Sequence, residues 1–269
     1  MTEPLAQSPK PLTLKGPFAS ILPRAEAGRW LLIGVGGFIV AQLLSMIFVT
    51  AVAAITGHSG DLKSYANASA PPGWYIASGL LGLWAGFALA AWGVLRSAAD
   101  EPRTLGLRFQ AFDLLGLPLG LVVQIVVGLA YRPFIHNQSK FDAPIEKLTG
   151  GSHGGMHVVI ILLTVLGAPF FEELFFRGVL LQSLMGLFTA WFSHARAALV
   201  IGAAVLVDGL LFGASHGQLA QLPGLIGVGV VLSLCYLWTG RLGMSILTHV
   251  GFNSVAIFAY TSGVVLWLH

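Results

Sequence analysis

The sequence predicts an all-α fold, a polytopic integral membrane helical bundle of about seven transmembrane helices. Of its 269 residues 56% are hydrophobic and only 9% are charged, whereas soluble domains carry about 25% charged residues. The mean hydropathy is +0.82, and the uncharged runs reach the roughly 20 residues that cross a bilayer. The short alternating strands of an outer-membrane barrel are not seen. Together these features exclude a disordered chain, a nucleic-acid module and a cytosolic enzyme.

The elements follow from the order of these runs. Five prolines and mixed charge in residues 1–29 predict a flexible cytoplasmic tail. The apolar runs after it predict helices at 30–56, 74–95, 113–131, 156–190 with a break near Pro169, 198–216, 222–239 and 243–268. We divide them into N-terminal transmembrane helices at 30–154, a core at 155–260 and the end of the last helix at 261–269.

The basic residues predict the orientation. Four precede the first helix and three follow the second, so the positive-inside rule places the N-terminus in the cytoplasm; they are Lys10, Lys15, Arg24 and Arg29, then Arg96, Arg103 and Arg108. Seven spans then put the C-terminus outside, although the mixed charges of the loop at 132–155 weaken this assignment. A bacterial plasma membrane is the expected location. The single cysteine, Cys235, can form no internal disulfide.

Charges inside the apolar runs are the most informative feature. Glu172, Glu173 and Arg177 lie among four phenylalanines, and a charge at the bilayer centre costs at least roughly 2.5–3.5 kcal/mol. Glu173 and Arg177 are four residues apart, so a helix places them on one face as an ion pair. Glu172 points about 100° away and needs a partner elsewhere. The alternative is a buried ion-pair cluster that only joins helices.

Two histidines on later apolar runs are candidate partners for Glu172. His216 follows Phe212 by four residues, and His249 precedes Asn253 by four. A carboxylate and two imidazoles can bind a divalent metal such as zinc or activate water directly, while Asn253 can donate to an oxyanion. Each histidine taken alone is more often a hydrogen-bonded core residue.

These residues resemble the Abi or CPBP intramembrane proteases, which include the eukaryotic type II CAAX prenyl endopeptidases. The family pattern is EExxxR, then FxxxH, then HxxxN or HxxxD on successive membrane helices. This chain supplies all three, with Glu172, Glu173 and Arg177, with Phe212 and His216, and with His249 and Asn253. The resemblance covers roughly residues 155–260, including Ala168-Pro169 before the acids.

The resemblance implies a role for each residue. Glu172 and His216 would activate the hydrolytic water, and His249 and Asn253 would support a metal or the oxyanion. Glu173, Arg177 and Phe212 would be structural support. If a metal is used, its ligands would be Glu172, His216 and His249. The implied function is hydrolysis of a peptide bond in a membrane-associated peptide or protein, with no nucleic-acid partner.

Other readings remain open at this point. Gly213 to Gly217 matches the G-x-S-x-G pattern of serine hydrolases, but that motif needs a strand-to-helix elbow. An aspartyl protease needs two opposed aspartates, and the spans offer only Asp208 and Asp113. The H-E-x-x-H motif of zincins is absent. The main rival is a non-catalytic membrane scaffold, immunity protein or partner subunit that has kept the polar cluster.

One geometric estimate opposes a shared site. Counted along straight spans, Glu172 and His216 lie at depths that differ by more than about 10 Å. A break at Pro169, or a re-entrant segment near Gly209 to Gly217, would bring them level, since irregular backbone is tolerated where it lines a cavity.

Overall fold

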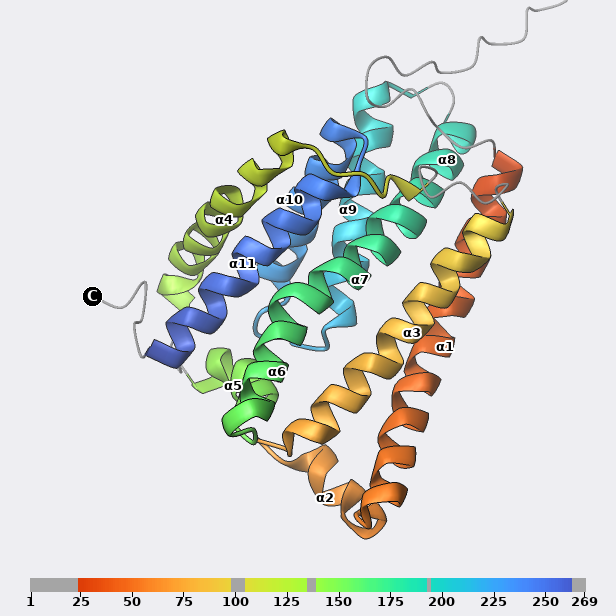
Figure 1. Ribbon diagram of the computed structural model, residues 1–269. Helices are drawn as coiled ribbons and strands as arrows, with labels where there is room; N and C mark the ends of the chain where they lie inside the picture. Colours follow the sequence, from red (N-terminus) through yellow and green to blue (C-terminus); the bar gives the residue numbers. More distant parts are fainter. Residues whose placement is uncertain (1–23, 98–104, 135–138, 193–194, 263–269) are drawn as a thin grey trace, which may run out of the picture.

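The computed structural model is a bundle of tilted helices (Figure 1). It describes residues 24–97, 105–134, 139–192 and 195–262, and within these ranges it contains helices but no strand. Seven helical stretches are long and apolar enough to cross a membrane, which confirms the predicted fold class. They are Glu26–Thr56, Gly73–Ser97, Ala111–Tyr131, Gly154–Trp191, Ala197–Ser215, Leu222–Thr239 and Leu242–Ser262.

The individual elements have the following bounds. The first half contains α1 (Arg24–Thr56), α2 (Leu62–Asn67), α3 (Gly73–Ser97), α4 (Gly116–Tyr131), which continues a short 3₁₀ turn, and α5 (Ser139–Thr149). The second half contains α6 (Gly154–Leu162), α7 (Ala168–Phe175), α8 (Gln182–Trp191), α9 (Ala197–Ser215), α10 (Leu222–Thr239) and α11 (Leu242–Ser262). The short helices α2 and α5 were not predicted.

The predicted boundaries need one correction, at the start of the first helix. The first helix begins at Arg24, six residues before the predicted start, because Arg24 to Arg29 continue the helix of the apolar run. The rest of the predicted tail, residues 1–23, lies outside the described residues. The last helix is described to Ser262, so residues 263–269 of its predicted end also lie outside them.

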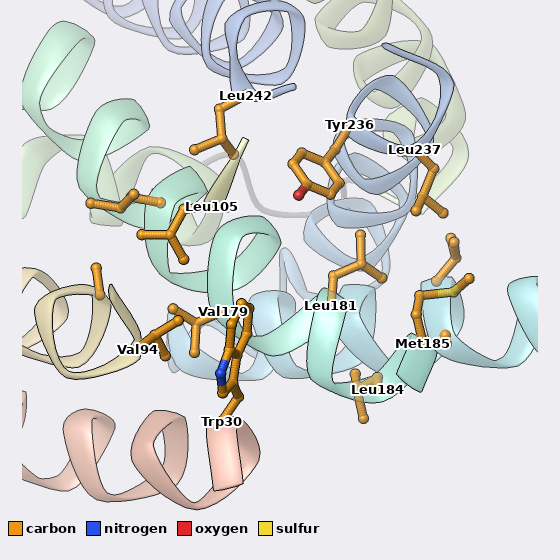
Figure 2. Close-up of a cluster of buried hydrophobic side chains, with 14 of the residues drawn as sticks. Trp30, Val94, Leu105, Val179, Leu181, Leu184, Met185, Tyr236, Leu237 and Leu242 are labelled. Atoms are coloured by element: carbon orange, nitrogen blue, oxygen red, sulfur yellow. The ribbon is translucent and has the colours of Figure 1, made fainter. Parts of the chain in front are cut away.

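The bundle has two different ends. At one end, a cluster of buried apolar side chains joins the start of α1, the end of α3, α8, the start of α9 and the α10–α11 turn (Figure 2). It includes Trp30, Val94, Leu105, Met185, Tyr236 and Leu242. We call this the closed end. The opposite end, which we call the open end, contains α2, α5, the start of α6 and the turn between α9 and α10 (Figure 1).

Close contact between α4 and α11 depends on glycine. A Cβ at Gly120 would overlap the Thr248 carbonyl, and a Cβ at Gly251 would overlap the Leu117 carbonyl. At the closed end Asp113 is fully buried, and its two carboxylate oxygens share the hydrogen of Arg241 Nε, each at 3.0 Å from that nitrogen. The two helices are therefore joined by backbone contact along their length and by an ion pair at one end.

The helix from Gly154 to Trp191 is continuous, so the predicted break near Pro169 is wrong. A π-helical turn at Leu163–Gly167 comes just before Pro169. In it, the Ala168 N–H donates to the carbonyl of Leu163. Proline has no N–H and its ring crowds the carbonyl four residues earlier. The wider π turn accommodates that ring without ending the helix.

This continuity also corrects the depth estimate. Glu172 lies 19 residues before Trp191, and His216 lies 19 residues after Ala197, where the next helix starts. Measured from that shared connection, both lie about 28 Å along their helices, at 1.5 Å per residue. The straight-span estimate was wrong because this helix has 38 residues and is longer than a bilayer core. No re-entrant segment is needed, since α9 is helical to Ser215.

Candidate active site

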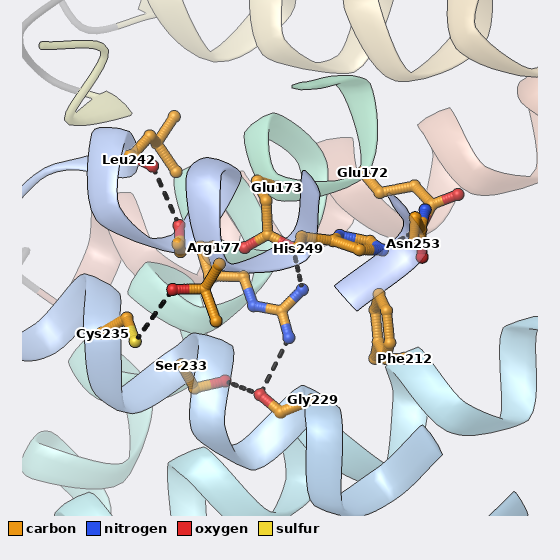
Figure 3. Close-up of polar contacts among 12 residues, drawn as sticks. Glu172, Glu173, Arg177, Phe212, Gly229, Ser233, Cys235, Leu242, His249 and Asn253 are labelled. Carbon is orange, nitrogen blue, oxygen red and sulfur yellow. Dashed lines mark hydrogen bonds and ion pairs between the residues drawn. The ribbon is translucent and has the colours of Figure 1, made fainter. Parts of the chain in front are cut away.

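Three side chains from three helices meet inside the bundle. Glu172 of α7 lies with its Oε2 atom 3.9 Å from the Nε2 atom of His216 at the end of α9. The same oxygen lies 3.9 Å from Nε2 of His249 on α11. Glu172 Oε2 is buried and makes no hydrogen bond to any described residue. One carboxylate oxygen therefore faces two imidazole nitrogens (Figure 3 shows Glu172 and His249).

The second nitrogen of each imidazole fixes its protonation. His249 Nδ1 lies 3.1 Å from Glu173 Oε1, and His216 Nδ1 lies 2.8 Å from the Phe212 carbonyl oxygen. A carboxylate and a carbonyl can only accept, so both Nδ1 atoms carry the hydrogen. In the neutral rings, both Nε2 atoms then present lone pairs toward Glu172. Three acceptors directed to one place suit a group that donates, such as water.

Glu173 connects the two charged motifs. Its Oε1 accepts a 2.8 Å hydrogen bond from Arg177 Nη1 as well as the bond from His249. The predicted pair of Glu173 with Arg177 is therefore present, and both side chains are fully buried. The structure adds that Glu173 also orients His249, a contact the sequence analysis did not predict. An orienting carboxylate of this kind fixes the tautomer of an imidazole.

Arg177 is the centre of a buried polar network (Figure 3). Besides Glu173, it donates a 2.8 Å hydrogen bond from Nη2 to the Gly229 carbonyl of α10. Its Nε lies 3.5 Å from Asp208 Oδ2 on α9, and Ser233 donates to that same oxygen at 2.7 Å. One guanidinium thus joins α9, α10 and the helix that carries Glu172. The sequence analysis considered Asp208 only as a candidate acid of an aspartyl protease, and it missed Ser233.

Phe212 packs against three members of the site. Its ring lies 4.6 Å from the Arg177 guanidinium carbon, 4.8 Å from the His216 ring and 5.6 Å from the His249 ring. The ring is almost fully buried. A cation over an aromatic face is attracted by the ring quadrupole. Phe212 therefore contacts the Arg177 guanidinium and both imidazole rings, and its packing helps to hold the two imidazoles in place.

Asn253 is anchored by the π turn. Its Nδ2 donates a 2.9 Å hydrogen bond to the Thr164 carbonyl. In a regular helix that carbonyl would accept from Ala168, but the Ala168 N–H is used by Leu163. Pro169, the next residue, has no N–H to offer. The Asn253 side chain therefore satisfies a carbonyl that Pro169 and the π turn leave free.

A cavity of about 870 Å³ adjoins these residues. Glu172, His216, His249 and Asn253 all line it, so the structure brings the four predicted residues to one cavity. Gln124 of α4 also lines it, is 92% buried and has an Oε1 atom with no hydrogen-bond partner among the described residues. The sequence analysis missed Gln124, although an amide inside the uncharged run at 114–131 was a usable signal.

Two competing chemistries find no support in this geometry. Ser215 lies within a helix turn and donates to the Phe212 carbonyl at 2.7 Å, so it is no nucleophile on a strand-to-helix elbow. Asp208 pairs with Arg177, whereas Asp113 pairs with Arg241 near the start of α11. The two aspartates therefore do not form the opposed pair that an aspartyl protease needs.

Glu172, His216 and His249 are the residues predicted to bind a metal if one is used. Within the described part of the chain, no three His, Cys, Asp or Glu side chains are grouped closely enough to hold a metal ion. The donor set as it stands does not fit a bound metal, so no step below uses one. The zinc option of the sequence analysis stays a prediction.

The fold and the site together define a class: a polytopic helical membrane protein with a buried carboxylate and two imidazoles beside a cavity. Residues 154–255 match the family model described as type II CAAX prenyl endopeptidase Rce1-like. The chain is also 30% identical over 144 residues to the membrane-embedded CAAX protease MroQ of Staphylococcus aureus (strain USA300). Both matches support the CPBP/CAAX protease family that the motifs indicate.

The extent of these matches is limited. The alignment with MroQ covers 54% of this chain and 55% of the relative, so the chain spans about half the length of the curated relative it matches. No solved structure gives a significant match. The matched family segment includes all seven motif residues and excludes α1, α3 and α4.

Proposed function

We propose that the protein is an intramembrane endopeptidase that hydrolyses a peptide bond in a membrane-associated peptide or protein. The observation that carries this proposal is the position of Glu172 Oε2, 3.9 Å from Nε2 of both His216 and His249, at the wall of a cavity. A buried carboxylate with two imidazoles is a general-base arrangement. The family match supports a protease, and the relative is described as a CAAX protease.

The proposed reaction begins with water held between Glu172 and an imidazole Nε2. Hydrogen bonds of about 2.8 Å to both groups are compatible with their separation. Glu172 takes a proton from the water, and the resulting hydroxide forms a bond to the carbonyl carbon of the substrate. The proton then passes to the leaving nitrogen as the carbon–nitrogen bond breaks, which leaves a carboxylic acid and an amine.

The oxyanion formed in this step needs hydrogen-bond donors. Asn253 has a second Nδ2 hydrogen besides the one that binds Thr164. We assign this second Nδ2 hydrogen to donate to the negative oxygen and stabilise it. Preorganised donors of this kind contribute about 10²–10³ in rate. The network of Glu173 and Arg177 supplies no proton and keeps His249 oriented.

The test uses the purified protein in detergent and a library of quenched fluorescent peptides. Glu172→Gln keeps the shape of the side chain and removes its basicity, so turnover should fall by about 10² or more. His216→Ala and His249→Ala should lose comparable activity, and adding Glu172→Gln to either should change little, because groups acting as one unit are non-additive. Asp61→Asn, at an exposed acid that does not line the cavity, is the matched control.

Two further results would change the proposal. Wild-type protein that cleaves no peptide, together with a Glu172→Gln variant that complements a deletion strain at matched expression, would favour the scaffold or partner-subunit alternative. Cleavage that stops with a chelator and returns with zinc would replace direct water activation with a metal-dependent reaction. Cleavage that is unaffected by the chelator supports the reaction as written.

A further inference from the structure

The cavity extends from the site toward one end of the bundle only. Around Glu172 it is lined by side chains from the middle of α1 and α3 and from α7. Away from Glu172 its lining comes from the ends of α4, α9 and α11, from the starts of α3 and α10, and from α5. This part of the lining includes Tyr131, Ile145, Gln218, Gln221 and Tyr260. At the other end, the hydrophobic cluster of Figure 2 fills the space between the helices. Substrate therefore reaches Glu172 from the open end.

The two ends differ in basic residues. Six basic residues of the described chain lie at the closed end, namely Arg24, Arg29, Arg96, Arg108, Arg196 and Arg241. Four lie at the open end, namely Lys63, Arg132, Lys140 and Lys147. The sequence adds Lys10 and Lys15 before α1, and Arg103 between α3 and Leu105. Basic residues in short loops collect on the cytoplasmic side, so the closed end is the cytoplasmic one.

The depth of the site agrees with this direction. Helix α9 has 19 residues and so spans about 28 Å, close to the roughly 30 Å of a bilayer core. His216 follows its last residue, and so it lies near the membrane boundary at the open end. The α9–α10 turn, which includes Gln218 and Gln221, continues the cavity wall beyond it.

The volume limits what can enter. A helix is about 10–12 Å wide, so a cavity of about 870 Å³ would hold fewer than two helical turns. A whole transmembrane helix does not fit. An extended segment has free backbone groups that must find partners in apolar surroundings, and the unpaired Oε1 of Gln124 is one acceptor available to it.

We propose that the active site opens to the extracytoplasmic face and accepts a short, extended peptide segment presented from that side. That a peptide substrate enters the cavity rests on the proposed function. The direction of opening rests on the charge distribution and on the cavity. The bond that is cut would lie near the outer membrane boundary and not in the cytoplasm.

The first experiment determines which face of the membrane each end of the bundle lies on, and it does not depend on enzymatic activity. Ala220→Cys in the α9–α10 turn and Lys63→Cys on α2 report on the open end, and Ala198→Cys near the start of α9 reports on the closed end; all three positions are exposed. Intact cells are treated with a membrane-impermeant maleimide. The open-end cysteines should be labelled in intact cells and Ala198→Cys only after permeabilisation. The wild type, whose Cys235 is buried, gives the background.

The opposite labelling pattern would overturn the inference and leave the proposed protease function untouched. A second experiment offers the quenched peptide library to sealed membrane vesicles. Cleavage should occur with right-side-out vesicles and should be absent with inverted vesicles until detergent is added. Cleavage only by inverted vesicles refutes the inference. If no preparation cleaves the peptides even in detergent, the protease proposal fails, and the labelling still decides which face the cavity opens to.

Discussion

Arg177→Ala is the variant whose effect on stability follows most directly from the structure. Arg177 is fully buried and holds two carboxylates, Glu173 at 2.8 Å and Asp208 at 3.5 Å. It also satisfies the Gly229 carbonyl at 2.8 Å. Removing one partner of a buried ion pair costs about 3–5 kcal/mol, because the remaining charge stays buried without compensation. Here two acids lose the same cation, so the upper part of that range is expected.

The assay is thermal unfolding of the purified protein in detergent. About 3–5 kcal/mol corresponds to a decrease in Tm of roughly 6–20 °C for a chain of this size. The Tm of Arg177→Lys should lie between those of the wild type and Arg177→Ala, since lysine keeps the charge but loses the planar fork that reaches several acceptors. Lys63→Ala, which removes an exposed cation, should change stability by less than about 0.5 kcal/mol. An Arg177→Ala protein with the Tm of the wild type would refute the claim that the ion pairs of Arg177 stabilise the fold.

Three other variants test separate parts of the structure. Glu173→Gln should lower kcat by about 10- to 100-fold with little change in KM, measured with a cleavable peptide, because the charge that orients His249 is lost. Asn253→Leu should lower Tm, because the Thr164 carbonyl loses its hydrogen-bond donor. The loss of an acceptor's partner destabilises a folded protein by about 1–3 kcal/mol. Gly243→Ala should also lower Tm, since its Cβ overlaps the Asp113 carboxylate, whereas Gly202→Ala has open space and should not.

Much of the fold could be predicted because a membrane helix is defined by its own composition. Each apolar run must satisfy its backbone internally, so length and hydropathy locate the seven spans. The short helices α2 and α5 lie outside those runs and carry mixed charge, as with Asp142 and Lys147 on α5. A search for long apolar runs passes over both of them, although α5 is amphipathic. Glu172, Glu173 and Arg177 were found for a related reason, since charges are costly in an apolar run.

The partners of Arg177 could not be predicted in the same way. Asp208 lies on the next helix, and the register between α9 and the helix of Glu172 depends on the length of that earlier helix. Ser233 is an ordinary residue of an apolar helix until Asp208 is placed beside it, at 2.7 Å. The dual role of Glu173 also needs three dimensions, because His249 reaches it across 76 positions of sequence.

The role of Pro169 shows how a local chemical property shapes the site. Its missing N–H and its ring require a wider turn, and the π turn at Leu163–Gly167 supplies it without ending the helix. One carbonyl, that of Thr164, is thereby left without a helical donor, and Asn253 of α11 provides the donor at 2.9 Å. Asn253 and His249 lie one turn apart on α11. The hydrogen bond at Thr164 therefore also fixes the height at which His249 faces Glu172, so a proline three residues before the acid helps to set the geometry of the imidazole opposite it.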